Sequence, residues 1–230
     1  MSVVAIIPAR GGSKGIPKKN LVDICGKPLL AWSIIQAQQA KEIDSVWVTS
    51  DDDEILAAAT HFGANVIKRP LDISGDTATS ESAWLHAINE IESLNGSIDL
   101  VVAMQATSPL REPSDLDEGL QLLREAKYDS LLSVTEVEDF FTWKIDKSNL
   151  AESINYDYRH RKRRQQIEKR YLENGSFYIF TPHQLRSQNN RLGGRIGLYV
   201  MDRHKMFQID NPEDILLCKA IMQGYQLDKA

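Results

Sequence analysis

Two cations and three glycines follow the first predicted strand and could together bind a polyphosphate. Residues 3–7 are a run of Val, Ala and Ile without alternation, which is typical of a parallel strand covered on both faces. Arg10 precedes the loop GGSKG, which contains Lys14. Glycine lets the main chain approach a ligand closely, and backbone N–H groups, a guanidinium and an ammonium attract phosphate. The carboxyl end of a strand is where an open α/β sheet binds its ligands.

The spacing of this loop differs from the two best-known phosphate motifs. It matches neither the P-loop pattern GxxxxGK[ST] nor the dinucleotide pattern GxGxxG. The alternative is an ordinary tight turn with solvated basic residues, and the position of the loop directly after the first strand disfavours it. The sequence therefore predicts a third kind of phosphate loop.

Strand and helix patterns alternate through the first 136 residues. This alternation predicts an α/β fold with a doubly wound, mostly parallel sheet. Further along the chain, patterns indicate a strand over 175–181, a polar surface segment over 184–190, a strand over 196–201 and a final helix. The earlier strands are expected over 3–7, 45–50, 65–68, 99–105 and 130–136, and the helices over 29–40, 51–62, 80–94 and 114–126.

Several polar residues are expected to cap these helices. The acidic triplet 51–53 lies at a helix N-terminus, where carboxylates accept amide hydrogen bonds and complement the helix dipole, so capping is favoured over metal binding. Ser114 is the expected N-cap of its helix, with Asp117 in the capping-box position. Asn211 should cap the last helix, with Pro212 at its first position.

The alternation breaks over residues 137–173, an excursion rich in aromatic and charged residues. Residues 159–170 hold seven Lys or Arg against the single acid Glu168. Such an excursion often covers a site or makes a dimer contact, while a charge run is most often a solvated face. The net charge of −5 and the pI near 5.6 argue against a dedicated nucleic-acid binder. We expect one domain over 1–230 that carries this excursion.

The cysteines and the apolar runs indicate the cellular compartment in which the protein is expected. Cys25 and Cys218 lie far apart without CxxC spacing, which predicts neither a disulfide framework nor a structural zinc site. No apolar run approaches the roughly 18 residues of a membrane span, and no signal-peptide pattern precedes the first strand. A cytoplasmic protein without membrane contact is the expectation.

Four segments carry a resemblance to a known family. They are IIPARGGSKGIPKKN at 6–20, QATSPLR at 105–111, RQQIEKRYLENGSFYI at 164–179 and QIDNPEDI at 208–215. Together they resemble the CMP-sialic acid synthetases, the acylneuraminate cytidylyltransferases of the wider sugar-cytidylyltransferase family. Members transfer CMP from CTP to the anomeric hydroxyl of a nine-carbon 2-keto acid and release pyrophosphate with Mg²⁺. The resemblance implies a Rossmann-like nucleotidyltransferase fold and a homodimer formed partly through the excursion.

The resemblance also implies roles for individual residues. Arg10, Lys14 and Asp210 would be catalytic, and Asp210 would hold the metal. Gln208 stands where relatives typically have Asp, so one of two expected metal carboxylates is an amide. The implied CTP-binding set is Ala9, Arg10, Gly11, Gly12, Ser13, Lys14, Asn20, Arg69 and Ser80, and the implied sugar-binding set is Gln105, Lys144, Arg164 and Asn174.

The residue types agree with this chemistry. Nucleotidyl transfer needs positioning and charge neutralisation more than covalent chemistry, and Arg10, Lys14 and Mg²⁺ would offset charge on the pyrophosphate leaving group. An arginine such as Arg164 suits the carboxylate of a 2-keto acid. No His or Cys lies in a motif that suggests a nucleophile, so we expect direct in-line attack by the sugar hydroxyl. The five histidines are interpreted as structural or surface residues.

Two alternatives remain open. The first is the same reaction on another acidic sugar, for example legionaminic acid. An eight-carbon keto acid or pseudaminic acid is disfavoured, because relatives acting on pseudaminic acid tend to lack the RQQ and NG pair that this chain has at 164–166 and 174–175. The second is a non-catalytic nucleotide-sensing or RNA-binding protein. Gln208 is a step in that direction, whereas Asp210 and the intact loop at 10–15 weigh against it.

Overall fold

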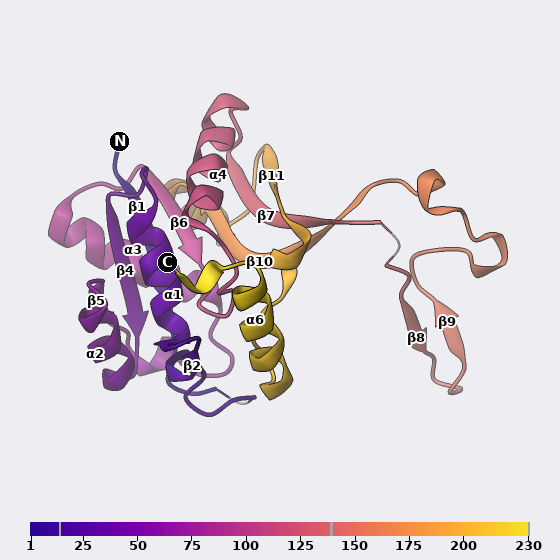
Figure 1. Cartoon of the computed structure of the whole chain (residues 1–230). Helices are drawn as coiled ribbons and strands as arrows, with labels where there is room; N and C mark the ends of the chain where they lie inside the picture. The colour runs from indigo at the N-terminus through magenta and orange to yellow at the C-terminus, as the bar shows by residue number, and fades with distance from the viewer. Residues whose placement is uncertain (14, 139, 230) are drawn as a thin grey trace.

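Seven strands form one twisted sheet in the computed structural model, which describes residues 1–13, 15–138 and 140–229 (Figure 1). The strand order is β11-β7-β10-β6-β1-β4-β5, and every neighbouring pair is parallel except those that β10 makes with β6 and β7. The predicted mostly parallel sheet is confirmed. The bounds are β1 Val3–Pro8, β4 Ser45–Ser50, β5 Asn65–Lys68, β6 Leu100–Met104, β7 Ser130–Val137, β10 Arg170–Phe180 and β11 Ile196–Met201.

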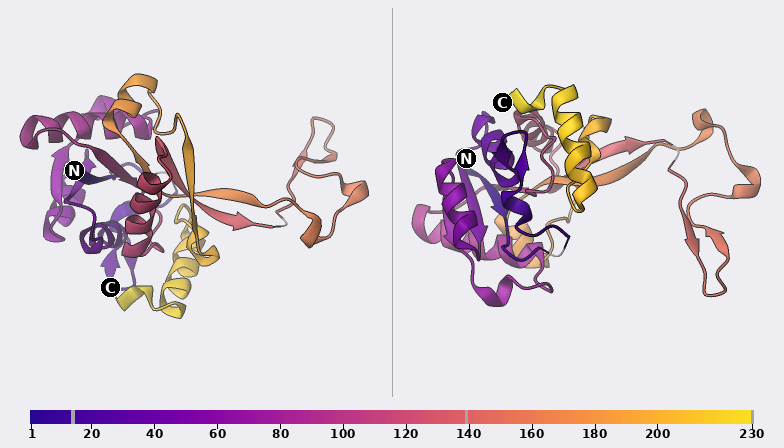
Figure 2. Two further views of the ribbon diagram at one scale, coloured as in Figure 1. Left: turned by 90° about the horizontal axis from the view of Figure 1, so that it is seen from above. Right: turned by 60° about the horizontal axis from the view of Figure 1, so that its bottom comes forward.

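Helices cover both faces of the sheet (Figure 2). In β1, Ala5 and Ile7 pack with α1 (Leu29–Gln39), α2 (Asp53–His61) and α4 (Pro113–Glu125). On the opposite face, Val4 and Ile6 pack with α3 (Ser80–Asn95) and α5 (Pro182–Gln188). Burial on both faces explains why β1 is a continuous apolar run.

A third apolar cluster fastens the C-terminal helix α6 (Pro212–Gly224) to the segment that follows the glycine-rich loop. That segment contains the 3-10 turn η1 (Lys19–Leu21) and a small hairpin of β2 (Asp23–Ile24) and β3 (Lys27–Pro28). Cys218 and Met222 of α6 pack here with Ile24 and Trp32. The packing brings the residues just before α6 against the loop.

Some predicted boundaries are wrong. The N-cap of α4 is Glu112, not Ser114, because Pro113 occupies the first helical position, where its missing N–H costs nothing. The backbone N–H of Glu112 donates to Asp115 at 2.7 Å, whereas Asp117 accepts from the backbone of the α1–β4 connection. The polar segment 184–190 falls largely within helix α5, and β10 begins five residues earlier than its expected start at 175.

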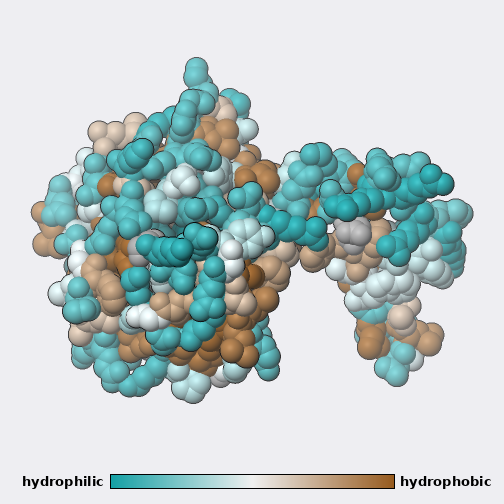
Figure 3. Space-filling view, viewed as in Figure 1, coloured by the Kyte–Doolittle hydropathy of each residue, from teal (hydrophilic) through white to brown (hydrophobic). Residues whose placement is uncertain are grey.

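The excursion over 137–173 projects from the sheet as an arm (Figures 1 and 2). It contains an antiparallel hairpin of β8 (Trp143–Ile145) and β9 (Ala151–Ser153). Aromatic side chains of the arm pack on one another and on its arginines, for example Arg161 over Phe141 at 4.6 Å. Hydrophilic residues dominate the arm in Figure 3, and hydrophobic residues gather at its lower end.

Among the described residues, no helix combines the length and the apolar character needed to cross a bilayer.

Candidate active site

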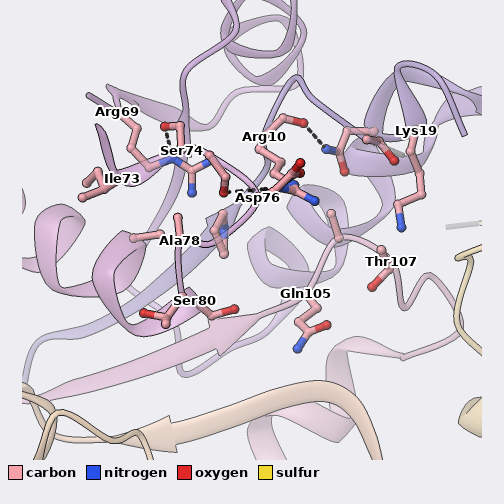
Figure 4. A pocket seen from close by; sticks show the side chains of 17 residues that line it. Arg10, Lys19, Arg69, Ile73, Ser74, Asp76, Ala78, Ser80, Gln105 and Thr107 are labelled. Atoms are coloured by element: carbon pink, nitrogen blue, oxygen red, sulfur yellow. Dashed lines mark hydrogen bonds and ion pairs between the residues drawn. The ribbon is translucent and has the colours of Figure 1, made fainter. Parts of the chain in front are cut away.

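A pocket of about 260 Å³ lies beside the carboxyl ends of β1, β5 and β6 (Figure 4). Three segments line it, one after each of these strands. Six predicted site residues meet there, which are Arg10, Ser13, Asn20, Arg69, Ser80 and Gln105. Figure 4 shows the cationic side chains along one side of the pocket, with Ser80 and Gln105 across from them. Parallel strands end at the same edge, so residues far apart in sequence converge.

The glycine-rich loop is anchored to the strand beside it. The N–H of Ala9 donates to the carbonyl of Thr49 at 3.0 Å, and the N–H of Gly11 donates to Asp51 Oδ1 at 3.1 Å. A Cβ at Gly11 would lie 2.6 Å from Asp52 Oδ2, so this position requires glycine, whereas Gly12 faces open space. Lys14, predicted to hold phosphate, lies outside the described residues.

Two arginines of the pocket are each paired with an aspartate. Arg10 Nη1 lies 3.0 Å from Asp76 Oδ1. Arg69 is only 6% exposed and pairs with Asp51 at 3.5 Å, while its Nε donates to Ser74 Oγ at 3.1 Å. Burial lowers the pKa of Arg69, the charge of Asp51 opposes that shift, and repulsion from Arg10 adds to it. The paired aspartates offset part of the repulsion between the two like charges.

Asp210 lies at the edge of the pocket through its contact with Lys19. Lys19 lines the pocket, and its Nζ lies 2.8 Å from Asp210 Oδ1. Gly15 packs directly on the main chain at this point, because a Cβ there would overlap the carbonyl oxygen of Asp210. The loop after β1 and the residues before α6 are therefore in direct contact beside the pocket.

Gln208 holds the same segment to the sheet. Its Nε2 donates to the carbonyl of Asn174 at 2.8 Å, and the N–H of Ile209 donates to the carbonyl of Thr107 at 2.9 Å. Gly175 has φ +61°, and a Cβ on it would lie 2.8 Å from Gln208 Nε2. A carboxylate could not donate to a carbonyl, so the amide at 208 has a structural use.

No group of three His, Cys, Asp or Glu side chains that could hold a metal ion occurs within 1–13, 15–138 and 140–229. The Asp210 side chain, 62% exposed, would offer a metal ion one carboxylate group. A single carboxylate suits Mg²⁺ when nucleotide phosphates and water complete the coordination, since this ion keeps several waters. The residues present fit a metal that arrives with its nucleotide.

Three predicted sugar-binding residues lie outside the pocket. Asn174 is 1% exposed, and its Oδ1 accepts from Ser133 Oγ at 2.6 Å. Lys144 pairs with Glu152 across the β8–β9 hairpin at 3.0 Å, and Arg164 pairs with Glu138 on the arm. Within one chain the fold does not bring Lys144 or Arg164 to the pocket, because the arm projects away from it (Figure 1).

Sequence reasoning missed several residues of the site, among them four charged or hydroxyl-bearing ones. Lys19 and Thr107 line the pocket, and both lie inside segments that the resemblance singles out. Asp51 was assigned to helix capping with the rest of its triplet, but Asp52 makes the capping bonds, accepting from the N–H groups of Glu54 and Ile55. Asp76 lies in a polar loop whose sequence carries no signal.

Comparisons with known proteins give a consistent result. A family model described as "Cytidylyltransferase" matches residues 4–228. The chain is 37% identical over 201 residues to an N-acylneuraminate cytidylyltransferase of Oncorhynchus mykiss, covering 86% of this chain and 45% of that protein. It is 32% identical over 227 residues to a pseudaminic acid cytidylyltransferase of Campylobacter jejuni, covering 96% of each. By contrast with this bacterial relative, the fish relatives are longer, and the chain spans about half their length.

Solved structures share the fold at low identity. A CMP:2-keto-3-deoxy-manno-octonic acid synthetase complexed with CTP superimposes with a TM-score of 0.71 at 19% identity, over 98% of this chain and 100% of that one. A 4-diphosphocytidyl-2C-methyl-D-erythritol synthase of Anaerococcus prevotii gives a TM-score of 0.66 at 15% identity, over 96% of each chain. The predicted Rossmann-like nucleotidyltransferase fold is confirmed.

Gly15→Ala should separate the loop from Asp210. The added Cβ has no room against the carbonyl oxygen of Asp210, so the wall of the pocket must shift. We expect binding of inorganic tripolyphosphate, measured by calorimetry, to weaken about tenfold, since small displacements of a binding group are costly. Gly224→Ala, where a Cβ meets open space, is the control. Unchanged affinity for tripolyphosphate in Gly15→Ala would contradict the assignment of this loop as a phosphate-binding loop.

Proposed function

The chain belongs to the cytidylyltransferase family, and on that premise we propose that it transfers CMP from CTP to an acidic nine-carbon 2-keto sugar. The observation that carries the proposal is the convergence of Arg10, Lys19 and Arg69 on one pocket at the carboxyl edge of the sheet. Three cations in a small pocket suit a triphosphate. The names of the relatives, which act on acylneuraminic and pseudaminic acids, support the acceptor class.

The residues of the pocket would work by position and charge. Arg10 and Lys14 would bind the triphosphate and offset the negative charge that develops on pyrophosphate, an electrostatic contribution that is usually large. Ser13, Gly12 and Asn20 complete the loop, and Asn20 supports it by donating to the carbonyl of Arg10 at 3.0 Å. The sugar hydroxyl would attack the α-phosphorus in line, without a covalent intermediate.

The rest of the proposed CTP set also lines the pocket. Arg69 and Ser80 would face the nucleotide, and Gln105 would face the sugar, as the resemblance implies. The location of all three on the pocket lining supports these roles. Ala9 contributes through its anchored main chain rather than its side chain.

Mg²⁺ would be held by Asp210 together with phosphate oxygens and water. When bound, the ion supplies positive charge next to the phosphates. The chain itself contributes the carboxylate and its neighbour Lys19, which lies 2.8 Å from it. Gln208 is tied to Asn174 and is therefore proposed as a support of this segment and not as a metal ligand.

The acceptor is proposed to be N-acetylneuraminic acid or a close analogue. Legionaminic acid is the first alternative. Pseudaminic acid stays in consideration because the Campylobacter jejuni relative named for it matches 96% of this chain. All three sugars carry a carboxylate, so the charge of the site does not distinguish them.

A homodimer would complete the sugar site. Lys144 and Arg164 lie on the arm, away from the pocket of their own chain. The β8–β9 hairpin exposes Ile145 and Leu150, which are 72% and 65% exposed. Apolar side chains gathered on a projecting hairpin mark a contact surface. A second copy seated on the arm would cover them and could receive Lys144 and Arg164 at its pocket.

Sedimentation tests the dimer. We expect the protein to sediment at twice the 26.0 kDa of one chain. The double variant Ile145→Asp, Leu150→Asp should shift toward the monomer, because it places charge in the contact, and Leu94→Asp, an exposed residue at the end of α3, should not. A wild-type protein that sediments at 26.0 kDa at micromolar concentration would refute the dimer.

Pyrophosphate release tests the proposed reaction. The purified protein with CTP and Mg²⁺ is offered N-acetylneuraminic, legionaminic or pseudaminic acid, and we expect release that depends on one of the sugars and on CTP. Arg10→Ala should lower turnover at least about 100-fold, as loss of a charged transition-state contact does. Arg186→Ala, on α5, is the control. Tight CTP binding without release with any sugar would favour a nucleotide-binding protein instead.

Asp210→Asn tests the metal assignment. An amide oxygen binds Mg²⁺ more weakly than a carboxylate, so the half-saturating Mg²⁺ concentration should rise about tenfold or more. Glu213→Gln, which removes an exposed carboxylate in the first turn of α6, is the matched control and should leave the titration unchanged. If Asp210→Asn titrates like the wild type, the ion is held elsewhere.

A further inference from the structure

Among the described residues near the pocket, Arg111 is the most deeply buried charged side chain, with 1% exposure. It lies between β6 and α4. Five hydrogen bonds hold its guanidinium, and all of them go to neutral oxygens. The acceptors are Ser176 Oγ at 2.9 Å and Ser176 O at 3.1 Å, Ser33 Oγ at 2.9 Å, Gln36 Oε1 at 3.4 Å and Gln105 O at 2.6 Å.

Among the described residues, no carboxylate forms an ion pair with this guanidinium. Asp115 is the acid whose charge raises the Arg111 pKa, and both Asp115 oxygens accept from Lys205 Nζ at 2.9 Å. Burial lowers the pKa of Arg111 to about 9, so it remains charged at pH 7. A buried charge without a contact ion pair usually costs stability, and an apolar residue of similar volume would fold as well or better. Stability alone therefore does not explain an arginine here.

The hydrogen bonds of Arg111 join two strands directly behind the pocket. Nη2 donates both to the carbonyl of Gln105, just after β6, and to the carbonyl of Ser176 in β10. The N–H of Gln105 also donates to the carbonyl of Ser176 at 3.2 Å. Gln105 and the two residues after it line the pocket, so the guanidinium fixes the main chain from which that part of the lining is built.

We propose that Arg111 is a positioning residue of this pocket. Its planar fork holds the Gln105 main chain at one position relative to β10, and its charge lies behind the lining, where low polarity strengthens its attraction for a bound anion. The expected effect on CTP rests on the proposed function. The expected effect on anion affinity does not, because it can be measured with a polyphosphate alone.

Two substitutions separate geometry from charge. Arg111→Met keeps the volume and removes both the fork and the charge, and Arg111→Lys restores the charge alone. Arg124→Met, on the exposed side of helix α4, is the control. Melting temperature, affinity for inorganic tripolyphosphate, and kcat and KM for CTP are measured for each variant.

We expect Arg111→Met to fold and to bind tripolyphosphate about tenfold more weakly than the wild type, with Arg111→Lys between the two. KM for CTP should rise by a larger factor than kcat falls. Arg124→Met should match the wild type. If Arg111 only filled space, its substitution would change the melting temperature but not the affinity for tripolyphosphate. The decisive readout is therefore whether Arg111→Lys, which restores the charge, recovers part of that affinity.

Each other outcome has a fixed meaning. Wild-type affinity in a folded Arg111→Met overturns the inference, as does a wild-type protein that binds no tripolyphosphate. If Arg111→Met does not fold, Arg111→Lys decides. A folded Arg111→Lys with weakened affinity for tripolyphosphate supports the inference. An Arg111→Lys variant that binds like the wild type, or that does not fold, overturns it. A wild-type protein that binds tripolyphosphate but turns over no CTP refutes the proposed function and leaves the Arg111 inference to be decided by its variants.

Discussion

Mutual repulsion among cations is the constraint that shapes this site. Arg10, Lys19 and Arg69 converge on one small pocket, and each is held by an aspartate at 3.0, 2.8 and 3.5 Å respectively. These aspartates keep the pocket assembled before a ligand arrives. A triphosphate would take over their role, because phosphate oxygens are stronger partners for a guanidinium than a single carboxylate oxygen. Under the proposed function, ligand binding at this site would therefore be an exchange of ion pairs, with a net free energy smaller than the number of contacts suggests.

Close contacts and hydrogen bonds fix the main chain around these charges. Gly11 and Gly15 allow the loop after β1 to touch Asp52 and Asp210 directly. Gln208 fastens the residues before α6 to β10, and Arg111 fastens the residues after β6 to the same strand. Strand β10, antiparallel to its neighbours, thus supports both the residues after β6 that line the pocket and the Asp210 segment that contacts the lining through Lys19. The same strand continues into the arm, so the pocket and the proposed dimer contact share one element.

The sequence predicts local features well and spatial partners poorly. The apolar runs and helical spacing place the sheet and four of its flanking helices, because burial on one or two faces leaves a direct pattern. Helix α5 was missed because its seven residues are too short to show a period. The resemblance led to Arg10, Arg69 and Gln105, which line the pocket, but Asp76 and Asp51 could not be found as partners of the two arginines, since such pairing depends on how distant loops meet. Lys144 and Arg164 were expected at the site, and within one chain the arm carries them away from it.

The most direct test of this account is a crystal structure of the protein with CTP bound. The account predicts the triphosphate on the Arg10 and Arg69 side of the pocket, with the Arg10–Asp76 ion pair opened and Asp210 on the metal that accompanies the nucleotide. CTP bound elsewhere, or bound here with all three aspartate pairs intact, would contradict it.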